Sequence, residues 1–180
     1  GGAPFYVYDR ALMTRRMNEL RTTLPDNLII KYAIKANPMP AVVHHMSSLV
    51  DGLDVASAGE LRVALDTGIE PIAVSFAGPG KMDWELRQAI AAGATLNLES
   101  ENEMERAAKI GVQQGVQPHV AVRVNPEFEL KSSGVKMGGG PKAFGVDAER
   151  VPNMLKRLGE LDLDFRGFHI YCGSQNLNSD

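Results

Sequence analysis

Hydrophobic residues recur along the chain in two alternating patterns. Short apolar runs, such as PIAVSFAG at 71–78 and HVAVRVNP at 119–126, predict strands. Segments 82–93 and 101–115 carry apolar residues every three or four positions and end in glycine, which predicts helices. The alternation runs from a strand at 27–36 to one at 163–174, with a further strand predicted at 4–9. Such alternation across short connections indicates an α/β fold with a parallel sheet.

Two architectures fit this order, an open doubly wound sheet and a closed (β/α)8 barrel. No G-x-G-x-x-G sequence follows the first strand, which weakens a dinucleotide-binding sheet. Polar residues gather at the carboxyl ends of the strands, where barrel enzymes build their sites. Counting from 27–36 gives about six strands, whereas a barrel has about eight. We therefore expect residues 1–180 to form an incomplete (β/α)8 barrel.

Composition removes several classes of function. The chain has 180 residues, 44% of them hydrophobic, and a formal net charge of −3, so it is a poor candidate for nucleic-acid binding. Cys172 is the single cysteine, which excludes an internal disulfide and fits a reducing, cytoplasmic setting. The absence of an apolar run of about 18 residues predicts no membrane span. The N-terminus has no charged region followed by an apolar one, so we expect no signal peptide.

Two lysines lie in one apolar run, IIKYAIKANPMP at 29–40. Side chains alternate along a strand, so Lys31 and Lys35 are expected on one face, about 13 Å apart. Lys35 lies at the carboxyl end, where a lysine amine can form a Schiff base with an aldehyde. The alternative is a lysine paired with a carboxylate, and position alone favours it. Lys31, near the opposite end, is interpreted as a residue for solubility or an ion pair.

Further polar residues follow the other strands. They are Asp54, Ser57 and Glu60, then Lys81, Glu99, Arg123, Asn125, His169, Tyr171, Ser174 and Gln175. Ser57, Glu101 and Glu103 suit helix N-termini, so capping is the favoured interpretation for them. Asp147 is the candidate N-cap of a helix at 147–161. Arg123 lies within an apolar strand, and a buried arginine needs a carboxylate or phosphate partner.

Four of these segments carry a family resemblance. YAIKANP, LDVASAGEL, RVNP and GFHIYCGSQ occur in the order, and near the spacing, of the alanine-racemase-fold (fold type III) decarboxylases that use pyridoxal 5'-phosphate (PLP). That family includes diaminopimelate, ornithine and arginine decarboxylases, and the resemblance covers essentially the whole chain. Residues 129–147 further resemble a subgroup associated with exosortase and exopolysaccharide gene clusters.

The resemblance implies a barrel followed by a β domain that this chain lacks, and a homodimer with shared active sites. Lys35 matches the lysine that holds PLP as an internal aldimine. Asp54 matches an acidic residue beside it, while Glu60 and Arg123 match residues of the cofactor surroundings. Ser174 matches a serine near the phosphate. The family's glycine-rich phosphate loop, its glutamate for the pyridine nitrogen and its partner-subunit residues lie further along the chain in relatives.

One position departs from the diaminopimelate branch, which carries two histidines where this chain has His169 and Tyr171. The second histidine stacks on the pyridine ring, and a phenol can also stack but cannot become a cation at neutral pH. A substrate other than diaminopimelate is therefore open. Cys172 is not at the position of the family's catalytic cysteine and is interpreted as a small buried residue.

The resemblance implies PLP-dependent decarboxylation of an amino acid through a carbanion. Two alternatives are a racemase of the same fold and a catalytically silent relative that binds partners. Racemases read KANAYGHG where this chain reads KANPMPAVV, which disfavours the first. The polar loop at 127–145 is either a lid over the barrel mouth or an ordinary surface loop. We expect no nucleic acid, membrane or metal among the partners.

Overall fold

The computed structural model describes residues 2–126, 135–136, 143–171 and 173–174. The helices are α1 (Arg10–Thr23), α2 (Pro40–Ser47), α3 (Ala58–Leu65), α4 (Asp83–Ala92), α5 (Glu101–Gln114) and α6 (Val151–Leu158), with short 3-10 turns η1 (Ile34–Ala36), η2 (Pro71–Ala73) and η3 (Ala148–Arg150). The strands are β1 (Lys31–Ala33), β2 (Gly52–Val55), β3 (Val74–Phe76), β4 (Thr95–Leu98), β5 (His119–Asn125), β6 (Val135–Lys136), β7 (Val146–Asp147), β8 (Asp164–Ile170) and β9 (Gly173–Ser174).

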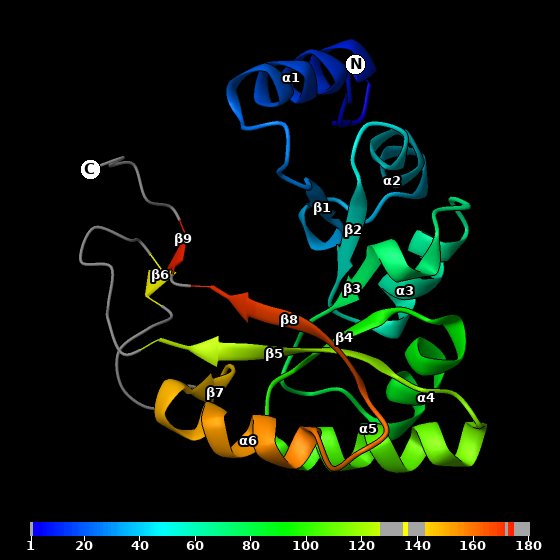
Figure 1. Ribbon diagram of the computed structural model, residues 1–180. Helices are drawn as coiled ribbons and strands as arrows, with labels where there is room; N and C mark the ends of the chain where they lie inside the picture. Colours follow the sequence, from blue (N-terminus) through cyan, green and yellow to red (C-terminus); the bar gives the residue numbers. More distant parts are fainter. Residues whose placement is uncertain (1, 127–134, 137–142, 172, 175–180) are drawn as a thin grey trace.

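The strands form one curved parallel sheet in the order β1-β2-β3-β4-β5, and both β7 and β8 pair with β5. The short strands β6 and β9 pair separately and antiparallel. Helices α3 to α6 lie along the outer side of the sheet (Figure 1). Strands β1 to β5 and β8 are six units of a parallel barrel, which confirms the predicted fold class and its incompleteness.

The two faces of the sheet differ sharply in polarity. On the outer face, residues of β2 to β5 are fully or almost fully buried against the helices: Leu53, Val55, Val74, Phe76, Leu96, Leu98, Val120 and Val122. Strand side chains alternate, so Asp54, Ser75, Asn97 and Arg123 face inward. Parallel register brings Ala33 beside Asp54, and Asp54 beside Ser75. A row of polar side chains therefore crosses the inner face, where a barrel builds its site.

Capping residues set most helix boundaries as predicted. The Ser57 hydroxyl accepts a hydrogen bond from the Glu60 backbone N–H at 3.2 Å, and begins α3. Helices α4 and α5 end at Gly93 and Gly115, both with left-handed φ angles of +83° and +67°. Helix α3 ends with Asp66 as its C-cap. Gly68 follows two residues later with φ of +80°.

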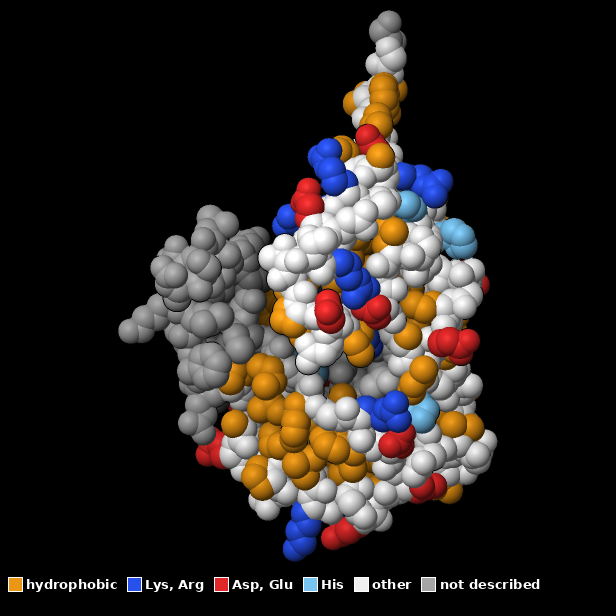
Figure 2. Space-filling view, turned by 45° about the horizontal axis from the view of Figure 1, so that its top comes forward, with side chains coloured by type: hydrophobic (Ala, Val, Ile, Leu, Met, Phe, Trp, Pro, Cys, Tyr) orange, Lys and Arg blue, Asp and Glu red, His pale blue; other side chains and the backbone are white. Residues whose placement is uncertain are grey.

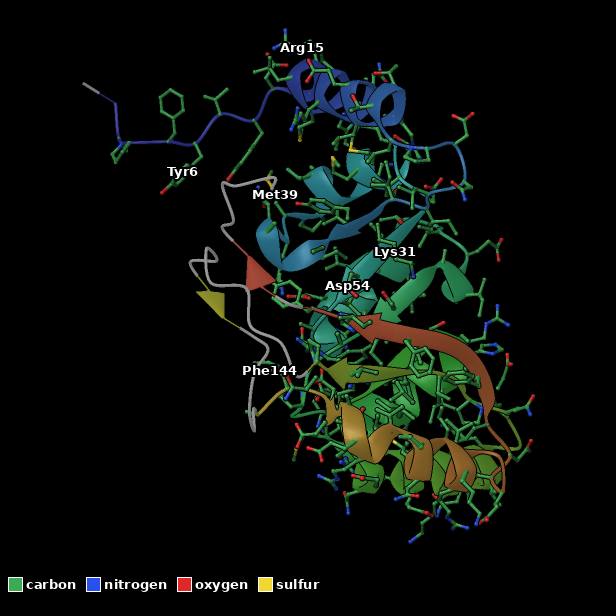
Figure 3. The ribbon with its side chains drawn as sticks, turned by 60° about the vertical axis from the view of Figure 1, so that its left-hand side comes forward. Tyr6, Arg15, Lys31, Met39, Asp54 and Phe144 are labelled. Carbon is green, nitrogen blue, oxygen red and sulfur yellow. The ribbon has the colours of Figure 1, made fainter. Side chains whose placement is uncertain are left out.

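The strand predicted at 4–9 is wrong. Residues 4–9 form no strand, and Phe5, Tyr6 and Val7 are 81%, 89% and 76% exposed. An extended segment becomes a strand only when its N–H and C=O groups pair with those of a neighbouring strand, and residues 4–9 have no such pairing among the described residues. Figure 2 shows the segment projecting from the body with hydrophobic side chains exposed along it, and Figure 3 shows Tyr6 on it.

The predicted cap at Asp147 is also wrong. Residues 148–150 form a 3-10 turn, so α6 begins only at Val151 and Asp147 makes no side-chain cap bond. Its carboxylate instead accepts a hydrogen bond from Asn125 Nδ2 at 2.8 Å, across from β5. In the part of the chain that the structure describes, no helix is long and apolar enough to cross a membrane.

Candidate active site

Lys35 lies on η1, directly after β1, and not on the strand itself. The strand ends at Ala33, so the strict alternation of faces from Lys31 to Lys35 was wrong. Tyr32 Oη donates to the Asn37 carbonyl at 3.2 Å, and Asn37 N–H donates to the Ile34 carbonyl at 3.0 Å. Ile34, the first residue of the turn, is fully buried. The turn is thus anchored from both sides, and Lys35 stands exposed at the carboxyl end of β1.

Asp54 lies on β2 beside Ala33, the residue just before the Lys35 turn. Its Oδ1 accepts a hydrogen bond from Ser75 Oγ at 2.7 Å. This bond holds the carboxylate in one orientation on the inner face. Ser75 did not emerge from the sequence, although a lone hydroxyl within the apolar run 71–78 was the available signal.

Arg123 and Glu99 form a buried ion pair at 2.9 Å, with side chains 9% and 1% exposed. The carboxylate partner expected for Arg123 is therefore found on the next strand. The carboxylate of Glu99 also accepts from the backbone N–H groups of Gly78 at 2.6 Å and Gly145 at 3.1 Å. Three donors on the Glu99 carboxylate thus tie the ends of β3, β4, β5 and β7 together at the barrel mouth.

Aromatic rings surround the Arg123 guanidinium. Its Cζ lies 4.9 Å from the ring centre of Phe144 and 5.9 Å from that of Tyr171. Both are within the range of cation–π attraction. Phe144 carried no signal in the sequence, because it lies in a polar loop. Tyr171 directly follows β8 and is half-buried. Its ring therefore lies beside the arginine at the carboxyl end of that strand.

His169 faces the same inner space from β8, in register with Arg123. Its buried Nδ1 has no hydrogen-bond partner among the described residues. Burial, and next the nearby positive charge of Arg123, lower the pKa of His169. The imidazole is therefore biased towards its neutral form, which can both donate and accept a hydrogen bond.

Two glutamates near helix starts, Glu60 and Glu103, make different contacts. Glu60 Oε2 accepts from the Ala56 N–H at 2.7 Å and stabilises the start of α3, so its contact is to the helix entry. Glu103 was expected to cap α5, but it forms a buried ion pair with Lys81 at 2.6 Å. Lys81 also donates to the carbonyls of Gly78 and Asn97 at 2.7 and 2.8 Å. The Glu103 backbone N–H does donate to Ser100 Oγ at 3.1 Å, as in a capping box, whereas the Glu103 carboxylate pairs with Lys81, which lies 22 residues away in sequence.

Burial raises the pKa of Glu103 more strongly than the Lys81 charge lowers it. All three donors of the Lys81 ammonium are occupied, so Lys81 pins the β3–α4 connection rather than serving a ligand. Glu101, the other predicted cap, pairs with Arg150 at 2.8 Å on the surface.

Several expectations fall outside the described residues. The strand β9 includes the backbone of Ser174, but nothing is described of its side chain. Cys172, Gln175 and most of the loop at 127–145 lie outside as well. The described residues contain no group of three or more His, Cys, Asp or Glu that could hold a metal ion.

A lysine amine at the mouth of a parallel barrel can form a Schiff base with an aldehyde. Residues 10–180 match the model of the pyridoxal-dependent decarboxylases over its pyridoxal-binding domain. The chain belongs to this family.

Curated relatives agree with the family. The chain is 34% identical over 180 residues to diaminopimelate decarboxylase of Aquifex aeolicus, covering 98% of this chain and 43% of that protein. It is 32% identical over 179 residues to an L-glutamyl-[BtrI acyl-carrier protein] decarboxylase of Niallia circulans, covering 98% and 42%. The chain thus spans less than half the length of these relatives. Neither supports the exosortase-associated subgroup suggested by residues 129–147.

Solved structures share the fold. Diaminopimelate decarboxylase of Helicobacter pylori, complexed with L-lysine, superimposes with a TM-score of 0.88 at 27% identity, covering 99% of this chain and 46% of that one. The arginine decarboxylase of Paramecium bursaria Chlorella virus gives a TM-score of 0.78 at 20% identity, a likeness of fold alone.

Proposed function

We propose that the protein containing this chain is a PLP-dependent amino-acid decarboxylase, with PLP attached to Lys35. The observation that carries this proposal is the anchored Lys35 turn beside Asp54, in a chain of the pyridoxal-binding family. Lys35 is the exposed amine at the carboxyl end of a barrel strand, which is where barrel chemistry occurs. Lys81, the other lysine near the mouth, is already saturated by three acceptors.

The residues present fit PLP. The Lys35 amine suits its aldehyde, the Tyr171 ring offers an aromatic face, and the unpartnered His169 Nδ1 offers a hydrogen-bonding group on the inner side. When bound, PLP supplies the electron sink for the bond that breaks in an amino acid. The chain's own residues bind, orient and transfer protons.

Each of these residues has a distinct part in the proposal. Lys35 would hold the cofactor through Nζ, and the same amine, when free, would carry protons. Asp54, oriented by Ser75, presents a fixed negative charge towards the Lys35 side of the site. Arg123, held by Glu99, keeps the Tyr171 ring in place through its cation–π contact. Ser174 is proposed for the phosphate.

The proposed substrate is an amino acid, free or carrier-bound. Relatives named above are decarboxylases of diaminopimelate and of an L-glutamyl carrier protein, and one solved relative is complexed with L-lysine. Tyr171 in place of the stacking histidine argues against assuming diaminopimelate. The proposal includes a homodimer with shared active sites, as the family resemblance implies.

Carbon dioxide release tests the proposal. The full-length protein should release CO2 from at least one member of a panel of amino acids and carrier-bound aminoacyl groups, and Lys35→Ala should abolish both this release and the visible absorbance of bound PLP. Lys109→Ala, an exposed lysine on α5, is the matched control and should behave as wild type. Racemisation without CO2, or bound PLP with neither product, would contradict decarboxylation.

A further inference from the structure

Lys31, the second lysine of the run at 29–40, is not an ordinary surface residue. It begins β1 and pairs in register with Gly52 of β2. A Cβ atom on Gly52 would come within 3.1 Å of both Cγ and Cε of Lys31, and would collide with the Ala73 carbonyl. The aliphatic part of the Lys31 side chain therefore packs over Gly52, in the space that the missing Cβ leaves on β2. This contact restricts the movement of the side chain away from β2.

The Lys31 amine faces the inner side of the barrel. Lys31 and Ala33 share one face of β1, and Ala33 is in register with Asp54. Lys31 and Asp54 come from neighbouring strands (Figure 3). Burial lowers the pKa of Lys31, and attraction to the Asp54 carboxylate raises it by less. The residue as a whole stays exposed on the open side of the barrel, yet its amine is partly desolvated and lies within the field of Asp54.

We propose that Lys31 is a positioning residue of this site: from the floor of the barrel it opposes Asp54 and reduces the proton affinity of the nitrogen that joins Lys35 to PLP. The inference rests on the proposed function, because it requires PLP on Lys35. A carboxylate near that nitrogen favours its protonated form, and an ammonium disfavours it. The balance between Asp54 and Lys31 thus sets how readily the nitrogen loses its proton.

The other charged groups around this inner space are largely compensated. Arg123 pairs with Glu99, and Lys81 pairs with Glu103, each within hydrogen-bonding distance. His169 is biased towards neutrality by burial. Among these described residues of the inner face, Lys31 and Asp54 are the two opposite charges whose balance a substitution of Lys31 changes.

A spectroscopic titration of the full-length holoenzyme tests this inference. Wild type, Lys31→Met and Lys31→Arg are compared by following the visible absorbance of bound PLP against pH, with Lys109→Met as a control for loss of one distant positive charge. All four should show the band at neutral pH. Lys31→Met should move the midpoint for proton loss upward by about one pH unit, whereas Lys31→Arg should lie at or below wild type. Lys109→Met should match wild type.

Three outcomes decide the matter. Equal midpoints for Lys31→Met, Lys31→Arg and wild type would overturn the inference while leaving PLP attachment intact. A Lys31→Met protein without the band would also overturn it, since Lys31 would then serve attachment itself. Absence of the band from wild type would overturn the proposed function, and this inference with it.

Discussion

At the residue scale, the inner face of the sheet shows how buried charge is accommodated. Arg123 lies in an apolar strand, and it is tolerated because Glu99 meets it at 2.9 Å and two backbone N–H groups complete the carboxylate. Removing one member of such a pair leaves the other charge buried and alone, which costs more than the pair contributes. The position of Arg123 thus serves stability as well as the proposed site.

Replacing Arg123 by methionine should lower the free energy of unfolding by about 3–5 kcal/mol, because Glu99 keeps its charge without a cation. Urea denaturation of the full-length protein measures the change. Arg150→Met is the matched control: Arg150 pairs with Glu101 at 2.8 Å, but its side chain is 61% exposed, so its loss should cost at most about 1 kcal/mol. Equal losses for the two variants would show that burial of the pair is not what matters.

The lowered pKa of His169 predicts that the folded protein loses stability in acid. Its pKa is lowered in the folded protein by burial and by Arg123, so below about pH 6.5 the unfolded chain binds more protons than the folded one. Stability should therefore fall as pH drops through that region, and should be unaffected by His169 above it. His169→Gln should lose less stability than wild type between pH 7.5 and pH 5.5, measured by urea midpoints.

The exposed His44 on α2 provides the comparison for this prediction. His44→Gln should follow wild type over the same pH change, since its side chain is solvated in the folded state. If His169→Gln and wild type lose the same stability on acidification, the lowered pKa of His169 is wrong.

At the element scale, the short turn η1 decides where the lysine stands. A longer β1 would have continued the alternation of faces, whereas the 3-10 turn redirects Lys35 and is held by the Tyr32–Asn37 bond and the buried Ile34. The hydrogen bonds and the buried side chain that hold the turn fix the orientation of the reactive side chain.

Replacing Tyr32 by phenylalanine should therefore weaken this turn. The lost bond to the Asn37 carbonyl should cost about 1 kcal/mol of stability and lower the occupancy of PLP, measured by absorbance after dialysis. Tyr6→Phe, on the exposed N-terminal segment, should change neither quantity. Unchanged occupancy in Tyr32→Phe would mean that the hydroxyl does not support the Lys35 turn.

The spacing of apolar residues and the capping residues predicted those elements whose limits depend on neighbours in sequence. Helices α4 and α5 combine amphipathic spacing with glycine C-caps, and they lie close to their predicted limits. The segment at 4–9 has a strand-like pattern, but whether it becomes a strand depends on a neighbour that the pattern cannot supply. Glu103 fits a cap by its spacing from Ser100, yet its partner Lys81 lies 22 residues away in sequence. Long-range pairs of this kind are set by tertiary packing.

At the scale of the whole molecule, the described residues form a partial barrel whose sheet ends at β1 on one side and at β8 on the other. Strand β8 borders β5, and its Phe168 and Ile170 are 54% and 57% exposed. The chain also covers less than half of its relatives. The motifs predicted the family and the barrel, but they could not show the Asp54–Ser75 bond or the Phe144 contact, since both join residues from separate segments.

The central claim is that Lys35, and not another lysine of the barrel, carries PLP. Borohydride reduction of the full-length holoenzyme, followed by peptide mass spectrometry, tests it by making the attachment permanent and locating it. We predict a pyridoxyl adduct on Lys35, in the peptide that includes Ala36 and Asn37. An adduct on Lys31 or Lys81, or none on any lysine, would contradict the account.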